Sequence, residues 1–323
     1  MQKVLELERA VIEVFGGCNY KCQMCPQTAG RGKDWKKKMP LSLFEDILEQ
    51  LPGTPIINLE GSGEPTMLKD LPDYISLCNK HGFNSFMYTN GARLTGSFMN
   101  EVVDAGISFI RFSCIGYDPL MYQKWMAIDN FELLKNNIKE TRDYINAVGS
   151  DCILSSYHLI LDNSNIEKEI DLYKRNFIDE LGIISYIWCM HNWSGNYAPG
   201  YTRGSKKKST CGRPFAPEIT VRAGGLDGKQ AAVTPCCQTM GPPNEAKSVL
   251  GHLSDQTLEE VYYGDLYEEL RDLHSKEDFD KIDYCKHCDF LYEDPEVLVW
   301  SNDPEADVDY MLGTNFSLKE YKK

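Results

Sequence analysis

The most informative stretch of the sequence is Gly17-Cys18-Asn19-Tyr20-Lys21-Cys22-Gln23-Met24-Cys25. Its three cysteines stand at intervals of four and three residues and follow an apolar run, residues 11–15, that is typical of a strand. Three thiolates on one loop can hold three corners of a cubic [4Fe–4S] cluster, because soft sulfur ligands select iron–sulfur clusters or zinc. Zinc sites and ferredoxin sites use four protein ligands, so this set predicts a cluster with one open corner.

The overall composition is that of an ordinary globular chain, with 323 residues, 42% of them hydrophobic and 25% charged. The formal net charge of −14 argues against nucleic acid as a partner, since phosphate binding needs a basic face. No apolar run approaches the ~20 residues of a membrane helix, and no signal-peptide pattern is present. We therefore expect a cytoplasmic protein with no membrane partner, in which twelve cysteines predict metal ligands rather than disulfides.

Apolar strands alternate with amphipathic helices along the first two thirds of the chain. Strands are expected at residues 11–15, 56–59, 85–88, 107–113, 152–161 and 183–188, and helices at residues 41–51, 71–81, 98–105, 130–147 and 166–178. Ser42 and Glu45 are placed as a capping box in the first helix. Six β–α repeats predict a parallel sheet, with functional loops at the carboxyl ends of its strands. A closed barrel needs eight repeats, so the expected α/β fold is a partial (β/α)6 TIM-like barrel.

A change of composition over residues 196–208 marks the expected domain boundary. We place the barrel at residues 1–200, a small C-terminal domain at 201–295 and a tail at 296–323. Residues 218–221 and 231–234 predict a hairpin, and residues 258–273 predict a helix. The tail has little periodicity and four acidic residues between Asp303 and Asp309, which indicates a surface wrap or partial disorder.

The Cys18-x3-Cys22-x2-Cys25 spacing resembles the signature of the radical S-adenosylmethionine (radical SAM) superfamily, and the six repeats resemble its partial barrel. In that family the open iron binds the amino and carboxylate groups of SAM. One electron from the cluster then yields methionine and a 5′-deoxyadenosyl radical, which abstracts a hydrogen atom from a substrate carbon. The resemblance implies a [4Fe–4S] cluster on these three cysteines, SAM as a cofactor, and an electron donor such as flavodoxin or ferredoxin.

A glycine-rich turn, Gly61-Ser62-Gly63-Glu64-Pro65, resembles the second signature of the family. The small residues let the backbone approach the methionine part of SAM, and Glu64 is expected to accept from its ammonium group. Such a turn is weak evidence by itself, because Gly and Pro mark ordinary turns. Its place after a strand, downstream of the three cysteines, makes the resemblance specific.

The family also implies SAM contacts from four scattered positions. Met24 stands where relatives usually carry an aromatic residue beside the adenine, and a methionine can pack against a ring too. Ser113 matches a ribose-contact position, but the usual acidic residue two positions later is Ile115 here. Asn90 and Asn163 fall in loops where relatives touch SAM, and both are equally typical of turns.

A second group of cysteines lies in the C-terminal part: Cys211, the pair Cys236-Cys237, and Cys285 with Cys288. A structural zinc site is one reading of such a set. The surrounding residues resemble the C-terminal extension of the SPASM/twitch subfamily, in its short form with one auxiliary [4Fe–4S] cluster. The resemblance implies ligation by Cys211, Cys236, Cys285 and Cys288, and a fully ligated cluster implies electron transfer rather than substrate binding.

Two further residues are candidates for catalysis. Cys237 could replace Cys236 as a cluster ligand, or it could point into the active site, where a thiol can donate a hydrogen atom to a substrate radical. His191 follows the last strand of the barrel, where loops carry function. It is either a general base or substrate-binding group, or an ordinary hydrogen-bonded loop histidine.

Together these features predict a radical SAM enzyme of the oxidoreductase or isomerase (epimerase) class that abstracts a substrate C–H hydrogen. Oxidation through the auxiliary cluster would give dehydrogenation, and thiol quenching would give epimerisation. Relatives with this short extension act on aminocyclitols, sugars or ribosomally made peptides, so the resemblance implies one of these substrates. We expect a small molecule of aminocyclitol or sugar type among them, since the barrel begins almost at once and leaves no room for a separate peptide-recognition domain. The alternative is a ribosomal-peptide epimerase or crosslinking maturase. An iron–sulfur electron-transfer or redox-sensing protein is a third hypothesis, but it has no use for an open cluster corner.

Overall fold

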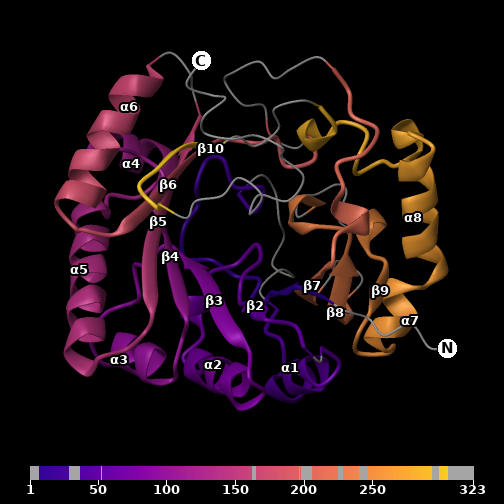
Figure 1. The fold of residues 1–323 in the computed structure, drawn as a ribbon, viewed down its shortest axis with the longest axis horizontal. Coiled ribbons are helices and arrows are strands. Elements are labelled where there is room, and N and C mark those ends of the chain that lie inside the picture. Colours follow the sequence, from indigo (N-terminus) through magenta and orange to yellow (C-terminus); the bar gives the residue numbers. More distant parts are fainter. Residues whose placement is uncertain are drawn as a thin grey trace.

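The main element of the protein is a mixed sheet in which the barrel strands lie side by side. The computed structural model describes residues 7–28, 37–51, 53–161, 165–195, 197, 206–224, 228–239, 246–292 and 298–304. Within these ranges the sheet has the strand order β10-β6-β5-β4-β3-β2-β1-β7-β8-β9 (Figure 1). The strands are β1 Arg9–Ile12, β2 Ile56–Asn58, β3 Asn84–Thr89, β4 Phe109–Ser113, β5 Ile153–Ile160, β6 Ile184–Cys189, β7 Glu218–Gly224, β8 Gln230–Thr234, β9 Gly251–His252 and β10 Leu298–Ser301.

Strands β1 to β6 pair in parallel, each with the next, and the helices between them cover the outer face of the curved sheet (Figure 1). These helices are α1 Leu41–Leu48, α2 Leu71–Lys80, α3 Gly96–Asp104, α4 Pro119–Met126, α5 Phe131–Val148 and α6 Ile166–Tyr173. Strand β1 pairs on its other side with β7, and β6 pairs on its other side with β10, so the sheet stays open. The fold is therefore the predicted partial (β/α)6 barrel, with its loops at the carboxyl ends of the strands available for function.

The predicted strands and helices of the barrel form because their apolar side chains, spaced as the sequence pattern indicated, are buried in the core. In α1, for example, Phe44, Ile47 and Leu48 recur at helical spacing and are all buried against the sheet. The predicted capping box is wrong, because Pro40 occupies the N-cap position and no side chain caps this helix. Ser42 is consequently the second helical residue. Helix α4 was not predicted.

The C-terminal part contains the predicted hairpin and two corrections. Strands β7 and β8 pair antiparallel, with Thr220 opposite Thr234. The single helix predicted over residues 258–273 is two helices, α7 Leu258–Tyr262 and α8 Asp265–Ser275, because Gly264 between them has an extended backbone. Residues Leu298–Ser301 form β10 antiparallel to β6, so the prediction of a surface wrap or disorder is wrong for this segment. The remaining acidic tail beyond residue 304 lies outside the described residues.

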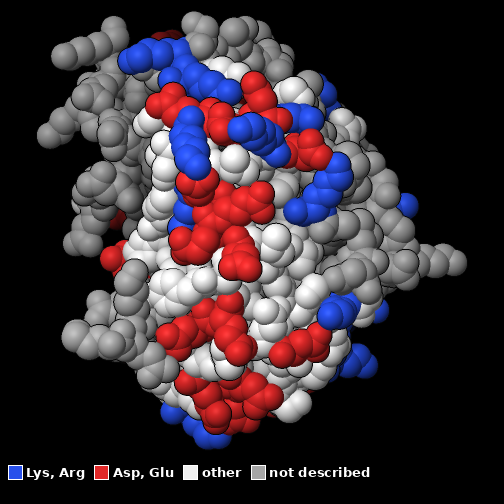
Figure 2. All heavy atoms as spheres, turned by 90° about the vertical axis from the view of Figure 1, so that its right-hand side faces the viewer, with Lys and Arg blue, Asp and Glu red and all other residues white. Residues whose placement is uncertain are grey.

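The surface reflects the acidic composition. Figure 2 shows the face that carries α8, where acidic side chains form broad patches and basic ones gather mainly toward one end. Within the part of the chain that the structure describes, no helix is long and apolar enough to span a bilayer.

Candidate functional site

The cysteine loop follows β1 and brings its three thiols to one place. Burial, then the nearby Glu64 carboxylate and the Cys25 thiol, raise the pKa of Cys18 to about 12. Burial, followed by Cys25 and Cys18, also raises the pKa of the Cys22 thiol well above its usual range. Half-buried thiols whose negative charges would repel one another fit a bound cation, which would hold them as thiolates at neutral pH. This donor set suits the three-cysteine [4Fe–4S] cluster.

Backbone and side-chain donors already face this group. The Tyr20 backbone N–H donates to Cys18 Sγ at 3.4 Å, and Asn90 Nδ2 lies 3.9 Å from the same sulfur. Asn90 Nδ2 also donates to Asn19 Oδ1 at 2.9 Å. The loop is thus fixed by contacts with the end of β3, the region in which the sequence placed a SAM contact.

The glycine-rich turn packs directly on the cysteine loop. The Glu64 backbone N–H donates to the Gly17 carbonyl at 2.8 Å. A Cβ atom on Gly63 would stand 1.9 Å from the Phe15 carbonyl oxygen, and one on Gly61 would stand 2.3 Å from Glu13 Oε2. Contacts this short do not occur in proteins, so only glycine fits both positions.

Glu64 joins the turn to the end of β3. Its Oε1 accepts from Thr66 N at 3.1 Å and from the hydroxyls of Thr66 and Thr89, each at 2.7 Å. Its Oε2 accepts from Asn90 N at 2.7 Å. Burial raises the pKa of this carboxyl and these hydrogen bonds oppose the rise. A carboxylate has about four acceptor positions, so Oε2 keeps capacity for the SAM ammonium, whose contact with Glu64 stays a prediction.

A buried polar network that the sequence did not predict holds the other side of the turn. Glu13 Oε2 accepts from the Ser62 backbone N–H at 2.5 Å and from its hydroxyl at 2.6 Å. Glu13 Oε1 accepts from Arg222 Nε at 3.4 Å and from Ala223 N at 3.3 Å, and Arg222 Nη2 donates to Ser62 Oγ at 2.9 Å. The available signal was a glutamate between two apolar residues at the end of a buried strand, because a buried charge needs partners.

The remaining predicted SAM contacts occupy varied surroundings. Met24 is buried in the core. Ser113, at the end of β4, donates to the Tyr157 hydroxyl at 3.2 Å. Asn163 lies outside the described residues. The roles of all three stay predictions.

The four cysteines predicted for the auxiliary cluster come together from three segments. Burial raises the pKa of Cys285 most, and Cys236, Cys211 and Cys288 raise it further. Burial likewise dominates the rise in the pKa of Cys236, to which Cys237, Cys288 and Cys211 also contribute. Four thiols that influence one another electrostatically, none in a disulfide, are a donor set that fits a fully ligated [4Fe–4S] cluster.

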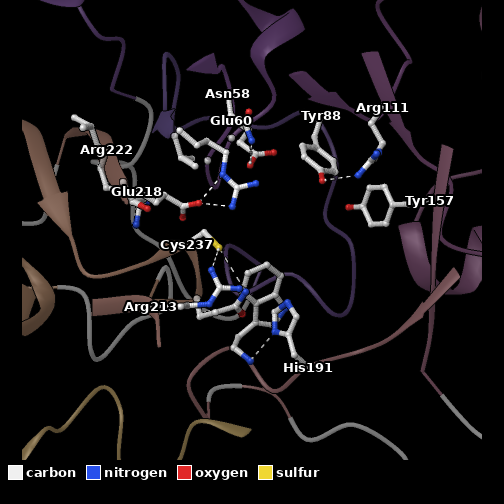
Figure 3. A pocket seen from close by; sticks show the side chains of 18 of the residues that line it. Asn58, Glu60, Tyr88, Arg111, Tyr157, His191, Arg213, Glu218, Arg222 and Cys237 are labelled. Carbon is white, nitrogen blue, oxygen red and sulfur yellow. Dashed lines mark hydrogen bonds and ion pairs between the residues drawn. The ribbon is translucent and has the colours of Figure 1, made fainter. Parts of the chain in front are cut away.

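A cavity of about 240 Å³ is lined by residues from both parts of the chain, among them Glu60 next to the glycine turn and Cys237 next to Cys236 (Figure 3). Gly61 and Gly63 line one part of it, and Cys237, Gln238 and Arg213 line another. Strands β1 to β7 all contribute side chains to its wall. A molecule in the cavity would therefore touch both the glycine turn of the expected SAM site and the neighbour of a predicted auxiliary-cluster ligand.

Charged side chains that the sequence analysis did not select line the barrel side of the cavity. Arg9 Nε donates to Glu218 Oε2 at 2.5 Å across the β1–β7 pair. Burial raises the pKa of Glu60 to about 7, although Asn58 donates to its Oε1 at 3.2 Å. Figure 3 shows Glu60 and Glu218 in the wall of the same cavity as Tyr88 and Arg111. Charged residues within or next to inward-facing strands were the signal for them.

Arg111 is held rigidly beneath the cavity. Its guanidinium carbon lies 4.2 Å from the centre of the Tyr186 ring, and between 5.2 and 5.5 Å from the rings of Phe86, Tyr88 and Trp188. It also donates to Ser155 Oγ at 3.0 Å and to the Tyr88 hydroxyl at 3.1 Å. Cation–π contacts with several rings fix this charge in place.

The two catalytic candidates both reach the cavity. The Cys237 sulfur accepts from Arg213 Nη1 and from Gln238 Nε2, each at 3.5 Å (Figure 3). His191 is only 4% exposed, and its Nδ1 accepts from the Trp193 backbone N–H at 3.2 Å. Because Nδ1 accepts this hydrogen bond, the proton of a neutral His191 ring is on Nε2. Whether either residue acts in catalysis stays a prediction.

Comparison with known proteins gives two domain matches. Residues 12–175 match the radical SAM superfamily, and residues 227–289 match the SPASM family, described as an iron–sulfur cluster-binding domain. These matches favour iron–sulfur clusters over zinc for both groups of cysteines.

Curated relatives share modest identity with the chain. It is 22% identical over 283 residues to the S-adenosyl-L-methionine-dependent 2-deoxy-scyllo-inosamine dehydrogenase of Niallia circulans. The aligned residues cover 86% of this chain and 90% of the relative. It is 31% identical over 119 residues to the 7,8-dihydro-6-hydroxymethylpterin dimethyltransferase of Methanocaldococcus jannaschii, which covers 35% of this chain and 23% of that protein. The chain spans about half or less of the length of several other curated relatives.

Solved structures share the fold at low identity. The structure of BtrN with AdoMet and 2-DOIA is 17% identical, with a TM-score of 0.56, over 87% of this chain and 92% of BtrN. Streptococcus suis SuiB bound to its precursor peptide SuiA is 16% identical, with a TM-score of 0.64, over 89% of this chain and 70% of SuiB. Because the superfamily match extends over half of the sequence, the chain belongs to the radical SAM superfamily, with [4Fe–4S] clusters and SAM as its cofactors.

Proposed function

We propose that this protein dehydrogenates a small molecule that carries hydroxyl or amino groups on a ring. The observation that carries the proposal is the lining of the cavity, which includes Gly61 and Gly63 of the glycine turn and Cys237, the residue next to the predicted cluster ligand Cys236. When bound, SAM and the clusters supply a 5′-deoxyadenosyl radical and an electron acceptor. The relative from Niallia circulans, which is named as a dehydrogenase, supports this choice.

The residues of the chain have separate tasks in this proposal. Cys18, Cys22 and Cys25 bind the cluster that activates SAM, and the turn at Gly61 and Gly63 admits its methionine part. The walls of the cavity orient the substrate carbon and exclude water, which prevents side reactions of a radical. Tyr157 and Trp188 offer ring faces on which a sugar-like ring can pack.

Glu60 is the residue best suited to receive a proton. Removal of hydrogen from an alcohol carbon, followed by loss of one electron, leaves a hydroxyl proton that must go to a base. The carboxyl of Glu60 lines the cavity and has a pKa of about 7, because burial opposes its ionisation. A base with a pKa near the working pH is efficient in such a transfer.

The test uses anaerobically reconstituted protein with a chemical reductant. About eight irons per chain are expected for two [4Fe–4S] clusters. SAM should yield 5′-deoxyadenosine, and Cys22→Ala should abolish this product, whereas replacement of the buried packing residue Cys78 by Ala should not. With 2-deoxy-scyllo-inosamine as probe, a product lighter by two hydrogens supports the proposal. Absence of 5′-deoxyadenosine from the intact protein would refute it.

Epimerisation is a second candidate because Cys237 lies on the cavity wall. A thiol there can return a hydrogen atom to the opposite face of a substrate radical, and the thiyl radical left on the sulfur would take one electron from the auxiliary cluster and a proton from solvent. In deuterated water an epimerised product should carry one solvent deuterium at the inverted carbon, and Cys237→Ala should remove that label while 5′-deoxyadenosine still forms. A dehydrogenated product of unchanged yield in Cys237→Ala excludes this candidate.

A further inference from the structure

The loop after β6 places two cavity residues on either side of one asparagine. His191 and Trp193 both line the cavity, and Figure 3 shows His191 in its wall. The rings of these two residues pack edge to face, with their centres 4.1 Å apart. Asn192, which stands between them, makes its contacts with a distant part of the chain.

Asn192 is hydrogen-bonded to the segment that contains Cys285 and Cys288. Its Nδ2 donates to the His287 carbonyl at 2.7 Å, and its Oδ1 accepts from the Asp289 backbone N–H at 3.1 Å. The Asn192 backbone N–H donates in turn to Asp289 Oδ2 at 2.8 Å. One residue thus binds the neighbours of Cys288 on both sides.

The backbone after Asn192 is strained and needs this support. Trp193, Ser194 and Gly195 have φ angles of +47°, +57° and +86°, in the left-handed region that residues with a Cβ rarely adopt. Such conformations persist only where the surrounding contacts hold them. Asn192 Oδ1 also accepts from the Gly195 backbone N–H at 3.1 Å, and a Cβ on Gly195 would stand 2.7 Å from His287 Cβ. The same asparagine therefore fixes the strained loop and the segment that the loop touches.

An apolar contact crosses the same junction. Phe290, which follows Asp289, is 2% exposed, and its ring centre lies 5.8 Å from that of His191. His191 thus contacts the segment after Cys288 while it lines the cavity. A shift of this segment would change the distance between the cavity wall and a predicted cluster ligand.

We propose that Asn192 is a positioning residue that holds the predicted auxiliary cluster close enough to the cavity for a substrate radical to pass its electron there. In that step the alcohol carbon radical loses one electron to the oxidised cluster and its hydroxyl proton to Glu60, which leaves a carbonyl. Asn192 itself exchanges neither an electron nor a proton. The inference rests on the proposed function and on the predicted ligation by Cys285 and Cys288.

The first test compares Asn192→Ala with the wild type, each as the anaerobically reconstituted full chain with SAM, a reductant and 2-deoxy-scyllo-inosamine as probe. Asn192→Ala should keep its iron content and its rate of 5′-deoxyadenosine formation, because the first cysteine loop and the glycine turn are unchanged. The yield of oxidised product per 5′-deoxyadenosine should fall about tenfold, since a misplacement of about 1 Å can reduce a rate by up to about 100-fold. Asn136→Ala, which changes an exposed asparagine on α5, is the control and should leave this ratio unchanged.

A second readout needs no substrate. Hydrogen–deuterium exchange of residues 285–291 in the reconstituted protein should be about tenfold faster in Asn192→Ala, because both side-chain hydrogen bonds to this segment are lost.

Gly195→Ala perturbs the same junction from the other side and decides the test if Asn192→Ala does not load its clusters. Its Cβ would press on His287, so it should give the same faster exchange and the same fall in the product ratio. Gly149→Ala is its control, because Gly149 also has a positive φ, +66°, but open space around its Cβ.

The outcomes separate this inference from the proposed function. If the product ratio stays at the wild-type value in Asn192→Ala and Gly195→Ala, the inference is wrong while the proposed function stands. It is equally wrong if product and 5′-deoxyadenosine fall in parallel, because Asn192 would then support only the fold. If the wild type forms 5′-deoxyadenosine but no product lighter by two hydrogens, the proposed function fails and the inference falls with it.

Discussion

Removal of Arg222 tests whether the buried network beneath the glycine turn is needed to hold the SAM site. Arg222 and Glu13 have side chains that are 1% and 2% exposed, so neither charge has access to water. The substitution Arg222→Met keeps a long apolar side chain and deletes the guanidinium. Glu13 would then remain as a buried carboxylate, with Ser62 deprived of one of its donors.

The expected loss of stability follows from what Glu13 retains. Loss of one member of a buried ion pair costs about 3–5 kcal/mol, because the other charge stays desolvated. Glu13 would keep the donors from the backbone N–H and hydroxyl of Ser62 and from Ala223 N. These contacts place the loss at the lower end, about 3 kcal/mol. With an unfolding entropy of about 2.1 cal/mol/K per residue, we expect the melting temperature of a chain of this size to fall by about 4–5 °C.

The assay is anaerobic thermal unfolding of the reconstituted protein, combined with measurement of SAM binding. Arg222→Met should also weaken SAM binding, because Ser62 belongs to the turn that approaches the cofactor. The double variant with Glu13→Gln removes both charges and should recover part of the stability. Arg175→Met, on an exposed helical residue, should leave both readouts within error. A fall below 1 °C for Arg222→Met, or strict additivity in the double variant, would refute the network as described.

Three more predictions concern the cavity and the turn. Gly63→Ala should abolish 5′-deoxyadenosine formation, since its Cβ would meet backbone oxygens that cannot move aside. Gly228→Ala, at an exposed position with open space around its Cβ, is the control. Its φ of +79° adds strain, so this variant should lose stability but keep activity. Glu60→Gln should abolish a pH dependence of stability. Burial raises the pKa of Glu60 from 4.5 to about 7, so the wild type loses about 1–3 kcal/mol of unfolding free energy as the pH rises through this window. If the unfolding free energies of the wild type and of Glu60→Gln changed equally with pH, the reasoning would be contradicted. Cys236→Ala should halve the iron content and Cys237→Ala should not; the reverse result would show that Cys237 is the ligand in place of Cys236.

The barrel and its motifs were predictable because their signals are local. The parallel strands are apolar runs followed by turn residues, and the spacing of Cys18, Cys22 and Cys25 lies within one loop. The glycine requirement at Gly63 was likewise visible as a motif, even though its cause, the approach of the Phe15 carbonyl, was not. Each of these features depends on residues that are near one another in the sequence.

The features that sequence analysis missed depend on pairings between distant segments. Arg222 meets Ser62 across 160 residues and Glu13 across 209. Strand β10 was missed because four residues with little periodicity become a strand only when β6 offers an unpaired edge. The capping box failed for a local reason, since a proline at the N-cap displaced the expected start of the helix.

The continuity of the sheet shows why the C-terminal part is needed for the site. The predicted boundary near residue 200 separates two sequence patterns, yet β7 pairs with β1 in the register that places Arg9 opposite Glu218. The same pairing brings Arg222 to Glu13, and through Glu13 to the glycine turn. The segment after β8 then supplies Cys237 to the cavity. A barrel without β7 would therefore lose one wall of the cavity and the support of the glycine turn. Radical initiation at the turn and the predicted electron acceptor thus both depend on the pairing of β1 with β7.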